Sequence, residues 1–143
     1  MKFSTLASAA TVVFVAPSAF ACPAGSLQET VNLMVSVGQH GEGADTDETE
    51  AAIDERTAEC QSDPYVLKVA ALARATLADT ADDKADRLKL REQALADFDR
   101  SASLASVGAP SELVMINGQA MAIGLSDTAE LRAALIAALD EDR

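Results

Sequence analysis

Residues Asp63 to Leu104 read DPYVLKVAALARATLADTADDKADRLKLREQALADFDRSASL, a stretch that predicts two helices joined by an acidic turn. Asp63 can accept hydrogen bonds from the free amides of a first helical turn, and Pro64 suits the first position of a helix. The helix that follows is apolar on nearly every side, because only Lys68, Arg74 and one threonine interrupt it. Such a helix needs neighbours on more than one side. We therefore expect it at the centre of a small helical stack.

The second helix of this pair is predicted to be amphipathic. One face is expected to carry residues that recur at helical spacing: Leu88, Arg91, Leu95, Phe98, Ala102 and Ala105. Charged residues such as Asp86 and Lys89 lie away from that face. Gly108 and Pro110 indicate where the helix has ended, because glycine favours the position after a helix and proline cannot continue one.

Three residues of this second helix follow a spacing known from a repeat family. Ala94, Phe98 and Ser101 place a small residue, an aromatic residue and another small residue in order. The segment in this respect resembles the second helix of a tetratricopeptide repeat, and Asp63–Tyr65 is similar to the junction between repeats. The chain from that junction to Pro110 is longer than one standard repeat. The resemblance implies antiparallel helices that stack as hairpins.

The first 21 residues have the organisation of a secretory signal peptide. Lys2 supplies a positive charge, Leu6–Ala16 is an uncharged apolar run, and Ala19–Ala21 forms an A-x-A cleavage pattern. The run is short for a membrane span, so we expect cleavage after Ala21 and a single mature domain of residues 22–143. Cys22 would then be the first mature residue. Its lipidation is the alternative, although the preceding residues fit the lipoprotein motif poorly.

The charge of the chain limits its partners. The sequence has 11 Lys and Arg residues against 23 Asp and Glu residues, for a net charge of −12. Loss of Lys2 with the signal peptide would make this −13, since ten basic residues would face 23 acidic ones. A strongly acidic surface does not attract nucleic acid or anionic membrane. A protein or peptide is the expected class of partner, and membrane association is expected only if Cys22 is lipidated.

The two cysteines, Cys22 and Cys60, both lie after the predicted cleavage site. One helix is predicted from Ser26 to Gly38 and a second from Asp47 to about Cys60. If these helices are antiparallel, the start of the first lies beside the end of the second, which brings the two thiols together. In the periplasm or outside the cell we expect a disulfide worth about 2–4 kcal/mol. The alternative is one reactive or lipidated cysteine and one free thiol.

The last third of the chain is predicted to hold two more helices. Ser111–Ile123 is nearly as apolar as the helix after Pro64, and Gly124 would end it. Asp127 begins a final helix with a solvated tail from Asp140. We expect no strand. The predicted fold is all-α, with about six antiparallel helices stacked as three hairpins, residues 26–60, 64–105 and 111–140, in a tetratricopeptide-like arrangement.

Residues suited to catalysis or to metal binding are sparse. The single histidine, His40, stands in a glycine-rich segment, and the acidic residues from Glu42 to Glu50 do not follow the ligand order of a calcium-binding loop. The sequence has no phosphate-binding glycine loop, nucleophile elbow or paired-cysteine motif. We predict no catalytic residue, no cofactor and no metal site.

These observations predict an exported helical-repeat-like protein that acts as a protein-binding, peptide-binding or scaffold module. The groove would be formed by the first helices of the hairpins, where polar residues interrupt apolar ones. The candidate groove residues are Lys68, Arg74, Asn117 and Gln119. Alternatively, these four are ordinary solvent-facing residues. The alternative functions are an enzyme or small-ligand carrier, with His40 and carboxylates converging on a pocket, or a structural domain without a partner.

Overall fold

A computed structural model describes residues 22–40 and 46–143 of the chain. Its elements are α2 (Ser26–His40), α3 (Thr46–Glu59), α4 (Pro64–Thr80), α5 (Lys84–Leu104), β1 (Glu112–Ile116), β2 (Gln119–Ile123) and α6 (Thr128–Asp142). The predicted signal peptide, residues 1–21, and the segment 41–45 lie outside the described residues. The described part is mostly helical, which confirms the fold class in its general form.

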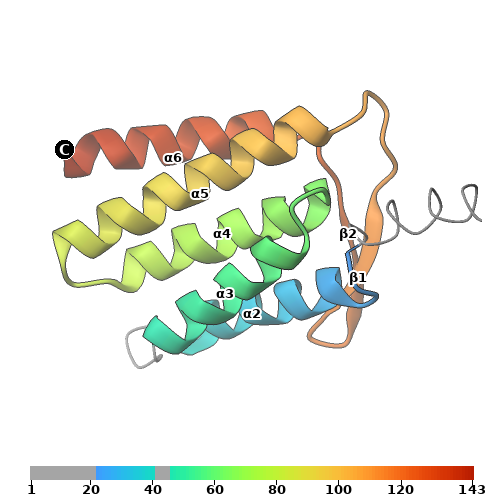
Figure 1. The fold of residues 1–143 in the computed structure, drawn as a ribbon, viewed down its shortest axis with the longest axis horizontal. Coiled ribbons are helices and arrows are strands. Elements are labelled where there is room, and N and C mark those ends of the chain that lie inside the picture. The colour runs from blue at the N-terminus through green and yellow to red at the C-terminus, as the bar shows by residue number, and fades with distance from the viewer. Residues whose placement is uncertain (1–21, 41–45) are drawn as a thin grey trace, which may run out of the picture.

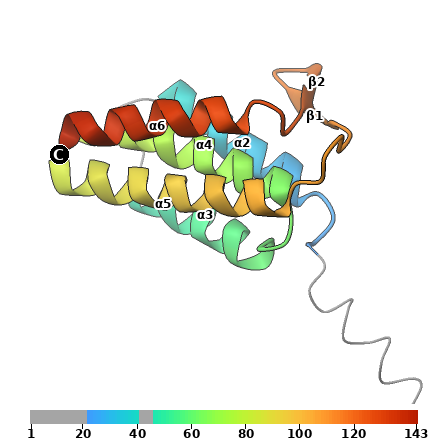
Figure 2. The same cartoon turned by 90° about the horizontal axis from the view of Figure 1, so that it is seen from above.

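The helices lie in antiparallel pairs with the strands at one end (Figures 1 and 2). The α2–α3 pair packs beside the α4–α5 pair, and α6 packs along α5. The small sheet lies at the end of the molecule where α2 and α4 begin and α5 ends (Figure 1). The first two helix pairs therefore follow the prediction.

Helix α4 is the centre of the structure. Every residue from Val66 to Ala71 is buried, which the apolar circumference of this helix predicts. At its start the Asp63 carboxylate accepts hydrogen bonds from the backbone amides of Tyr65 and Val66, at 2.9 and 3.2 Å, and Pro64 is the first helical residue. The predicted cap and the predicted central position are both confirmed.

The buried face of α5 differs from the predicted one. Its buried residues are Leu90, Ala94, Phe98 and Ser101, whereas Ala102 is exposed. Phe98 packs in one cluster with Ala71 of α4 and Leu135 of α6. The Ser101 hydroxyl donates to the Pro64 carbonyl at 2.7 Å, so a polar residue is accommodated where α5 meets the start of α4. The spacing of Ala94, Phe98 and Ser101 thus predicts the buried face of α5 better than the series from Leu88 to Ala105 does.

The helix predicted at Ser111–Ile123 is wrong, because this segment is a β-hairpin. Its strands β1 and β2 pair antiparallel, with Ile116 opposite Gln119 around the two-residue turn Asn117-Gly118. Both turn residues have positive φ, 51° and 80°, as a type I′ turn requires. Asparagine and glycine tolerate this backbone, and the turn sets the strand register. The expectation of no strand fails with it, and the described residues form five helices where about six were expected.

The third predicted helical hairpin is also wrong, because the β-hairpin lies between the two segments it would need. Val114 of β1 packs instead against Val31 of α2 and Val69 of α4. The predicted final helix is present, and its Leu135 and Leu139 are buried. It packs against α5, which is already paired with α4, so in the described residues α6 is not part of a separate helical pair.

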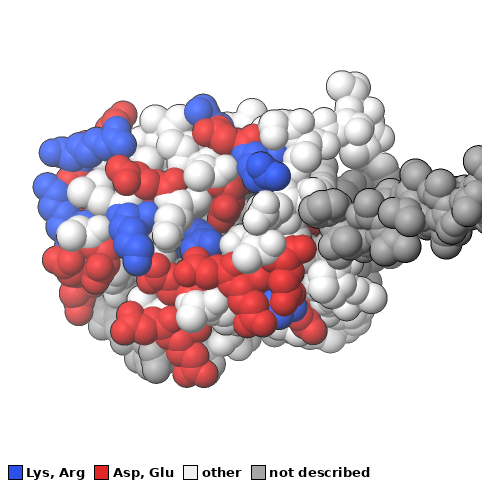
Figure 3. Space-filling model, in the orientation of Figure 1, with Lys and Arg blue, Asp and Glu red and all other residues white. Residues whose placement is uncertain are grey.

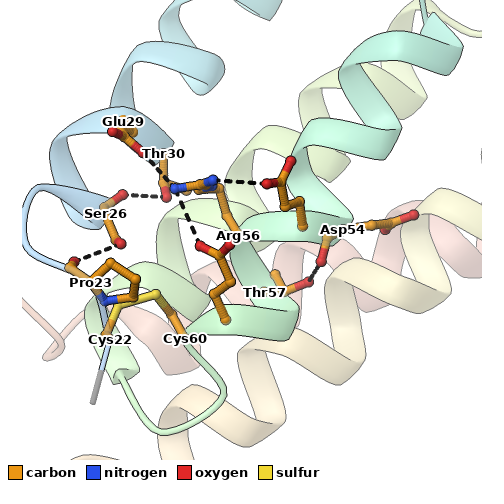
Figure 4. A network of polar contacts seen from close by, with 11 residues as sticks. Cys22, Pro23, Ser26, Glu29, Thr30, Asp54, Arg56, Thr57 and Cys60 are labelled. Atoms are coloured by element: carbon orange, nitrogen blue, oxygen red, sulfur yellow. Dashed lines mark hydrogen bonds and ion pairs between the residues drawn. A yellow bond between two sulfur atoms is a disulfide. The ribbon is translucent and has the colours of Figure 1, made fainter. Parts of the chain in front are cut away.

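The predicted disulfide between Cys22 and Cys60 is present, with 4.7 Å between their Cα atoms. It joins the start of α2 to the end of α3, as the antiparallel pairing predicts (Figure 4). Arg56 of α3 reinforces this junction by pairing with Glu29 of α2 at 2.5 Å. The bond therefore fixes the end of the α2–α3 pair that lies toward the β-hairpin (Figure 1).

Two glycine substitutions test the role of the turn. Gly118→Ala forces a side chain into positive φ, and we expect the free energy of unfolding to fall by about 1 kcal/mol. Gly38→Ala is the matched control, because this exposed helical glycine has open space around its Cα. It should raise stability by about 0.4–1 kcal/mol. Urea unfolding followed by circular dichroism measures both changes; the same sign for both would contradict the assigned turn.

Candidate functional site

One segment of the surface differs in character from the rest. Residues 101–126 contain a single charged side chain, Glu112, whereas 24% of the whole chain is charged. The large hydrophobic side chains that stand out as exposed in the described residues all belong to this segment: Val107, Leu113, Met115 and Met121. Figure 3 shows charged side chains over the helices and few at the end that carries the hairpin. We call residues 105–126 the low-charge end.

The β-hairpin of the low-charge end has one inward and one outward face. Val114, Ile116 and Ile123 face inward and join the cluster of α2 and α4. Side chains alternate along a strand, so Leu113 and Met115 of β1 share the outward face with Ala120 and Ala122 of β2. All four are exposed, and the Leu113 side chain is 75% exposed. The outward face is therefore apolar and uncovered.

The two edges of the hairpin are treated differently by the fold. At the β1 edge, the side-chain amide of Gln28 donates to the Met115 carbonyl at 2.9 Å and accepts from the Met115 amide at 2.8 Å. This amide group imitates the pairing of a neighbouring strand. In the described part of the chain, no side chain or loop bonds the outward-pointing backbone groups of Ala120 and Ala122 in β2. The β2 edge is open.

A hollow of about 350 Å³ lies beside the hairpin, between the loop that follows α5 and the link from β2 to α6. It is lined by uncharged residues: Ala105, Ser106, Val107, Gly108, Ala109, Ser111, Gly124, Leu125 and Ser126. Gly124 lies close to the far wall of the hollow, because a Cβ at this position would lie 3.2 Å from the Ser111 hydroxyl oxygen and would displace that side chain by a few tenths of an ångström. The hollow extends the uncharged surface from the outward face toward Val107.

Lys68, predicted as a groove residue, instead holds the low-charge end to α4. Its side chain is 5% exposed, and its ammonium group donates to the Gly124 carbonyl and pairs with the Asp127 carboxylate. The Tyr65 hydroxyl, also on α4, donates to the Pro110 carbonyl. The chain is thus tied to α4 shortly before β1 and directly after β2, which fixes the position of the hairpin.

Arg74 is also buried, at the junction of three helices. Its guanidinium donates to Asp97 of α5 at 2.8 Å and to Asp54 of α3 at 2.7 Å. Burial raises the pKa of Asp97, and the positive charge of Arg74 counters that rise only in part. Arg74 therefore joins α3, α4 and α5 and offers no charge to a ligand.

Asn117 and Gln119, the other two predicted groove residues, belong to the turn and the first position of β2. The amide of Gln39 donates to the Asn117 side chain at 3.3 Å, and Gln119 is exposed. The structure does not bring the four residues into one groove between two helices. The segment that was expected to form the second of these helices forms the β-hairpin instead. The predicted groove is therefore wrong in its geometry, and the two buried residues hold elements together.

The described residues contain no group of three or more His, Cys, Asp or Glu side chains arranged to hold a metal ion. His40 is the last residue of α2, and the neighbouring acidic segment, in part, lies outside the described residues. No helix in residues 22–40 and 46–143 is long and apolar enough to cross a membrane.

Comparison with known proteins identifies no relative. No protein family matches the sequence, and neither a curated protein nor a solved structure matches the chain. Inferences about function therefore rest on the chain's own residues.

The low-charge end is not predicted when residues 111–123 are interpreted as a helix. Two signals for it are present in the sequence: the Asn117-Gly118 pair between alternating apolar residues, which is a strong hairpin signal, and the near absence of charge from residue 101 to 126. Interpreted as a helix, the same apolar run predicts a buried element and no exposed surface.

Removal of the Arg74 charge tests the junction of α3, α4 and α5. Arg74→Met leaves the Asp97 carboxylate buried without its cation, and we expect the free energy of unfolding at pH 7 to fall by about 3 kcal/mol. The loss should shrink as the pH falls toward 4. The reason is that the pKa of Asp97, already raised, rises further in the variant, so the folded protein takes up the proton before the unfolded chain does.

Arg132→Met is the matched control, since Arg132 pairs with Asp99 on the surface, where both side chains are about half exposed. It should cost less than about 1 kcal/mol. Urea unfolding across this pH range measures both variants. A loss for Arg74→Met that stays constant with pH would contradict the assigned role of Asp97.

Proposed function

We propose that this protein is an exported interaction module that binds a partner protein or peptide through its low-charge end. The observation that carries the proposal is the outward face of the β-hairpin, where Leu113, Met115 and two alanines are exposed together. Contiguous exposed apolar surface of this kind is typical of interaction sites. The sequence-based expectation of a binding module is retained, and its site moves from a helical groove to the hairpin.

The setting of the face supports this proposal. Lys68, Tyr65 and Gln28 fix both ends and one edge of the hairpin, so the apolar side chains stand on a positioned support. The acidic surface of the helices favours a partner whose apolar contact residues are flanked by basic ones, because complementary charges steer association. The partner class is therefore a protein segment with apolar residues beside Lys or Arg.

A tetratricopeptide-like arrangement and export are further parts of the proposal. The antiparallel pairs α2–α3 and α4–α5 and the buried Ala94, Phe98 and Ser101 support the former. The disulfide Cys22–Cys60 supports residence in an oxidising compartment, either the periplasm or the outside of the cell. The organisation of residues 1–21 supports delivery to that compartment by a signal peptide.

Crosslinking in the exporting host tests the binding face. A photoreactive amino acid in place of Leu113 should form an adduct with a partner, and the same partner should be captured from position 115. The change Met115→Asp should reduce the adduct from position 113 about tenfold or more, because it puts a charge into an apolar contact. Mass spectrometry of the adduct identifies the partner and measures its yield.

Ala137 provides the matched control, since it is an exposed alanine on α6, away from the low-charge end. A photoreactive residue there should not capture the partner, and Ala137→Asp should leave the adduct from position 113 unchanged. Equal capture from positions 113 and 137 would overturn the proposed face.

Intact mass tests the export. The mature protein should begin at unmodified Cys22 and gain two hydrogens on reduction, because its two cysteines form one disulfide. A start at Met1 would contradict signal cleavage, and a start elsewhere before residue 22 would contradict cleavage after Ala21. A diacylglycerol-sized addition on Cys22 would make the protein a lipoprotein and exclude the disulfide.

A further inference from the structure

The open edge of β2 offers backbone hydrogen-bonding groups, whereas the outward face of the hairpin offers apolar side chains. In a hairpin with a two-residue turn, the pair that closes the turn, Ile116 and Gln119, is hydrogen-bonded, and bonded and non-bonded pairs then alternate. The amide and carbonyl of Ala120 and Ala122 therefore point away from β1. The bonds from Met115 to Gln28 verify this alternation, because Met115 is the partner of Ala120.

The β2 edge lacks the features that keep strand edges apart. The strand, Gln119-Ala120-Met121-Ala122-Ile123, has no proline and no charged residue, and its register with β1 has no bulge. Met121 lies on the inward side of β2 and is exposed, whereas its partner Val114 in β1 is buried, so this part of β2 extends beyond the helices that cover the inward face of the hairpin. Natural proteins usually block such an edge with charge, proline or a bulge. This edge is available for pairing.

We propose that the β2 edge pairs antiparallel with the β2 edge of a second copy of this chain, forming a four-stranded sheet across a twofold axis at Met121. In this register Ala120 of each copy lies opposite Ala122 of the other. The two amides and two carbonyls of Ala120 and Ala122 that point outward in each copy are then all hydrogen-bonded to the other copy. The inference concerns the edge and does not depend on the proposed function, which uses the outward face.

The second copy fits this edge for three reasons. The pairing is self-complementary, as a twofold interface requires, because the same two residues donate and accept on each side. The axis brings the two Met121 side chains together, and each is 48% exposed in the single chain. Two molecules of net charge −12 repel one another, and the hairpin offers them a contact with no charge on either β2 strand.

The arrangement of the two copies follows from the register. A twofold axis perpendicular to the sheet places both outward faces on the same side, so Leu113 and Met115 of the two copies form one wider apolar face. Both helical bodies lie on the opposite side. A contact through a single five-residue strand is smaller than a standard stable interface, so the dimer should dissociate on dilution. Added salt should favour it by screening the repulsion between the acidic bodies.

Cysteine crosslinking at the axis tests the register. Opposed residues in a non-bonded antiparallel pair have Cα atoms about 4.5 Å apart, a separation that a disulfide can span. Met121→Cys in the mature chain should therefore form a covalent dimer on mild oxidation. In Gln119→Cys the two introduced thiols would lie about 13 Å apart, four strand residues from one another, and should not crosslink. We expect at least tenfold faster crosslinking at position 121.

Sedimentation of the unmodified mature chain gives a second measurement that needs no variant. A shift from monomer to dimer with rising concentration, strengthened by salt, supports the proposal. A chain that stays monomeric at all concentrations, or equal crosslinking rates at positions 119 and 121, overturns it. A foreign extended peptide that occupies the β2 edge of a monomer also overturns it.

The outcomes for the edge and for the outward face are separable. Met121→Glu places like charges on the axis and should abolish the dimer, while capture of a partner from position 113 remains. Leu113→Asp with Met115→Asp should abolish capture and leave crosslinking at position 121 within about twofold, since these residues lie on β1, one strand from the axis.

Discussion

Helix α4 has almost no face that can be left in water, and the rest of the structure is arranged to cover it. Apolar residues surround nearly the whole helix, and burying them stabilises the fold in proportion to the area removed from water. α2, α3 and α5 each cover a part of the circumference. These helices leave the first turns of α4, after Pro64, to be covered by the β-hairpin, whose Val114 packs against Val69. The hairpin is thus both a piece of the core and the support for an exposed surface.

The two cations of α4 explain how the covering elements are held in place. Lys68 and Arg74 interrupt the apolar surface, and both are buried because each finds carboxylate or carbonyl oxygens on neighbouring elements. A buried charge is costly without such partners, so the positions of these partners are tightly constrained. Arg74 joins the helices α3 and α5 to α4. Lys68 joins the link between β2 and α6, and through it the hairpin, to the same helix.

The distribution of charge separates the molecule into two parts with different properties. The helices carry most of the charge, and a large net charge favours solubility and repels acidic surfaces. The low-charge end carries exposed apolar side chains and a strand edge that no part of residues 22–40 and 46–143 pairs with. In the proposals above, the outward face receives a partner and the β2 edge receives a second copy. The two surfaces are next to one another, so pairing at the edge would enlarge the face.

Local residue patterns were sufficient to predict much of the helical part. The cap at Asp63, the apolar circumference of α4 and the antiparallel order of α2 and α3 were all predictable, and the last of these brought Cys22 to Cys60. These features depend on residues close together in the sequence or on one simple pairing. The segment 111–123 was not predicted, because an apolar run fits a buried helix and a strand equally well unless the turn is recognised.

The candidate site depended on contacts between residues far apart in the sequence. Lys68 can be buried only because Gly124 and Asp127 come within hydrogen-bonding distance of its ammonium group. Both residues are more than fifty positions away in the sequence. Gln28 closes the β1 edge from 87 residues away, and no property of either residue alone indicates that pairing. Local chemistry therefore fixes helices, caps and the turn, whereas exposure and edge pairing arise only when the elements pack together. The reason is that burial and charge pairing are properties of neighbours in space.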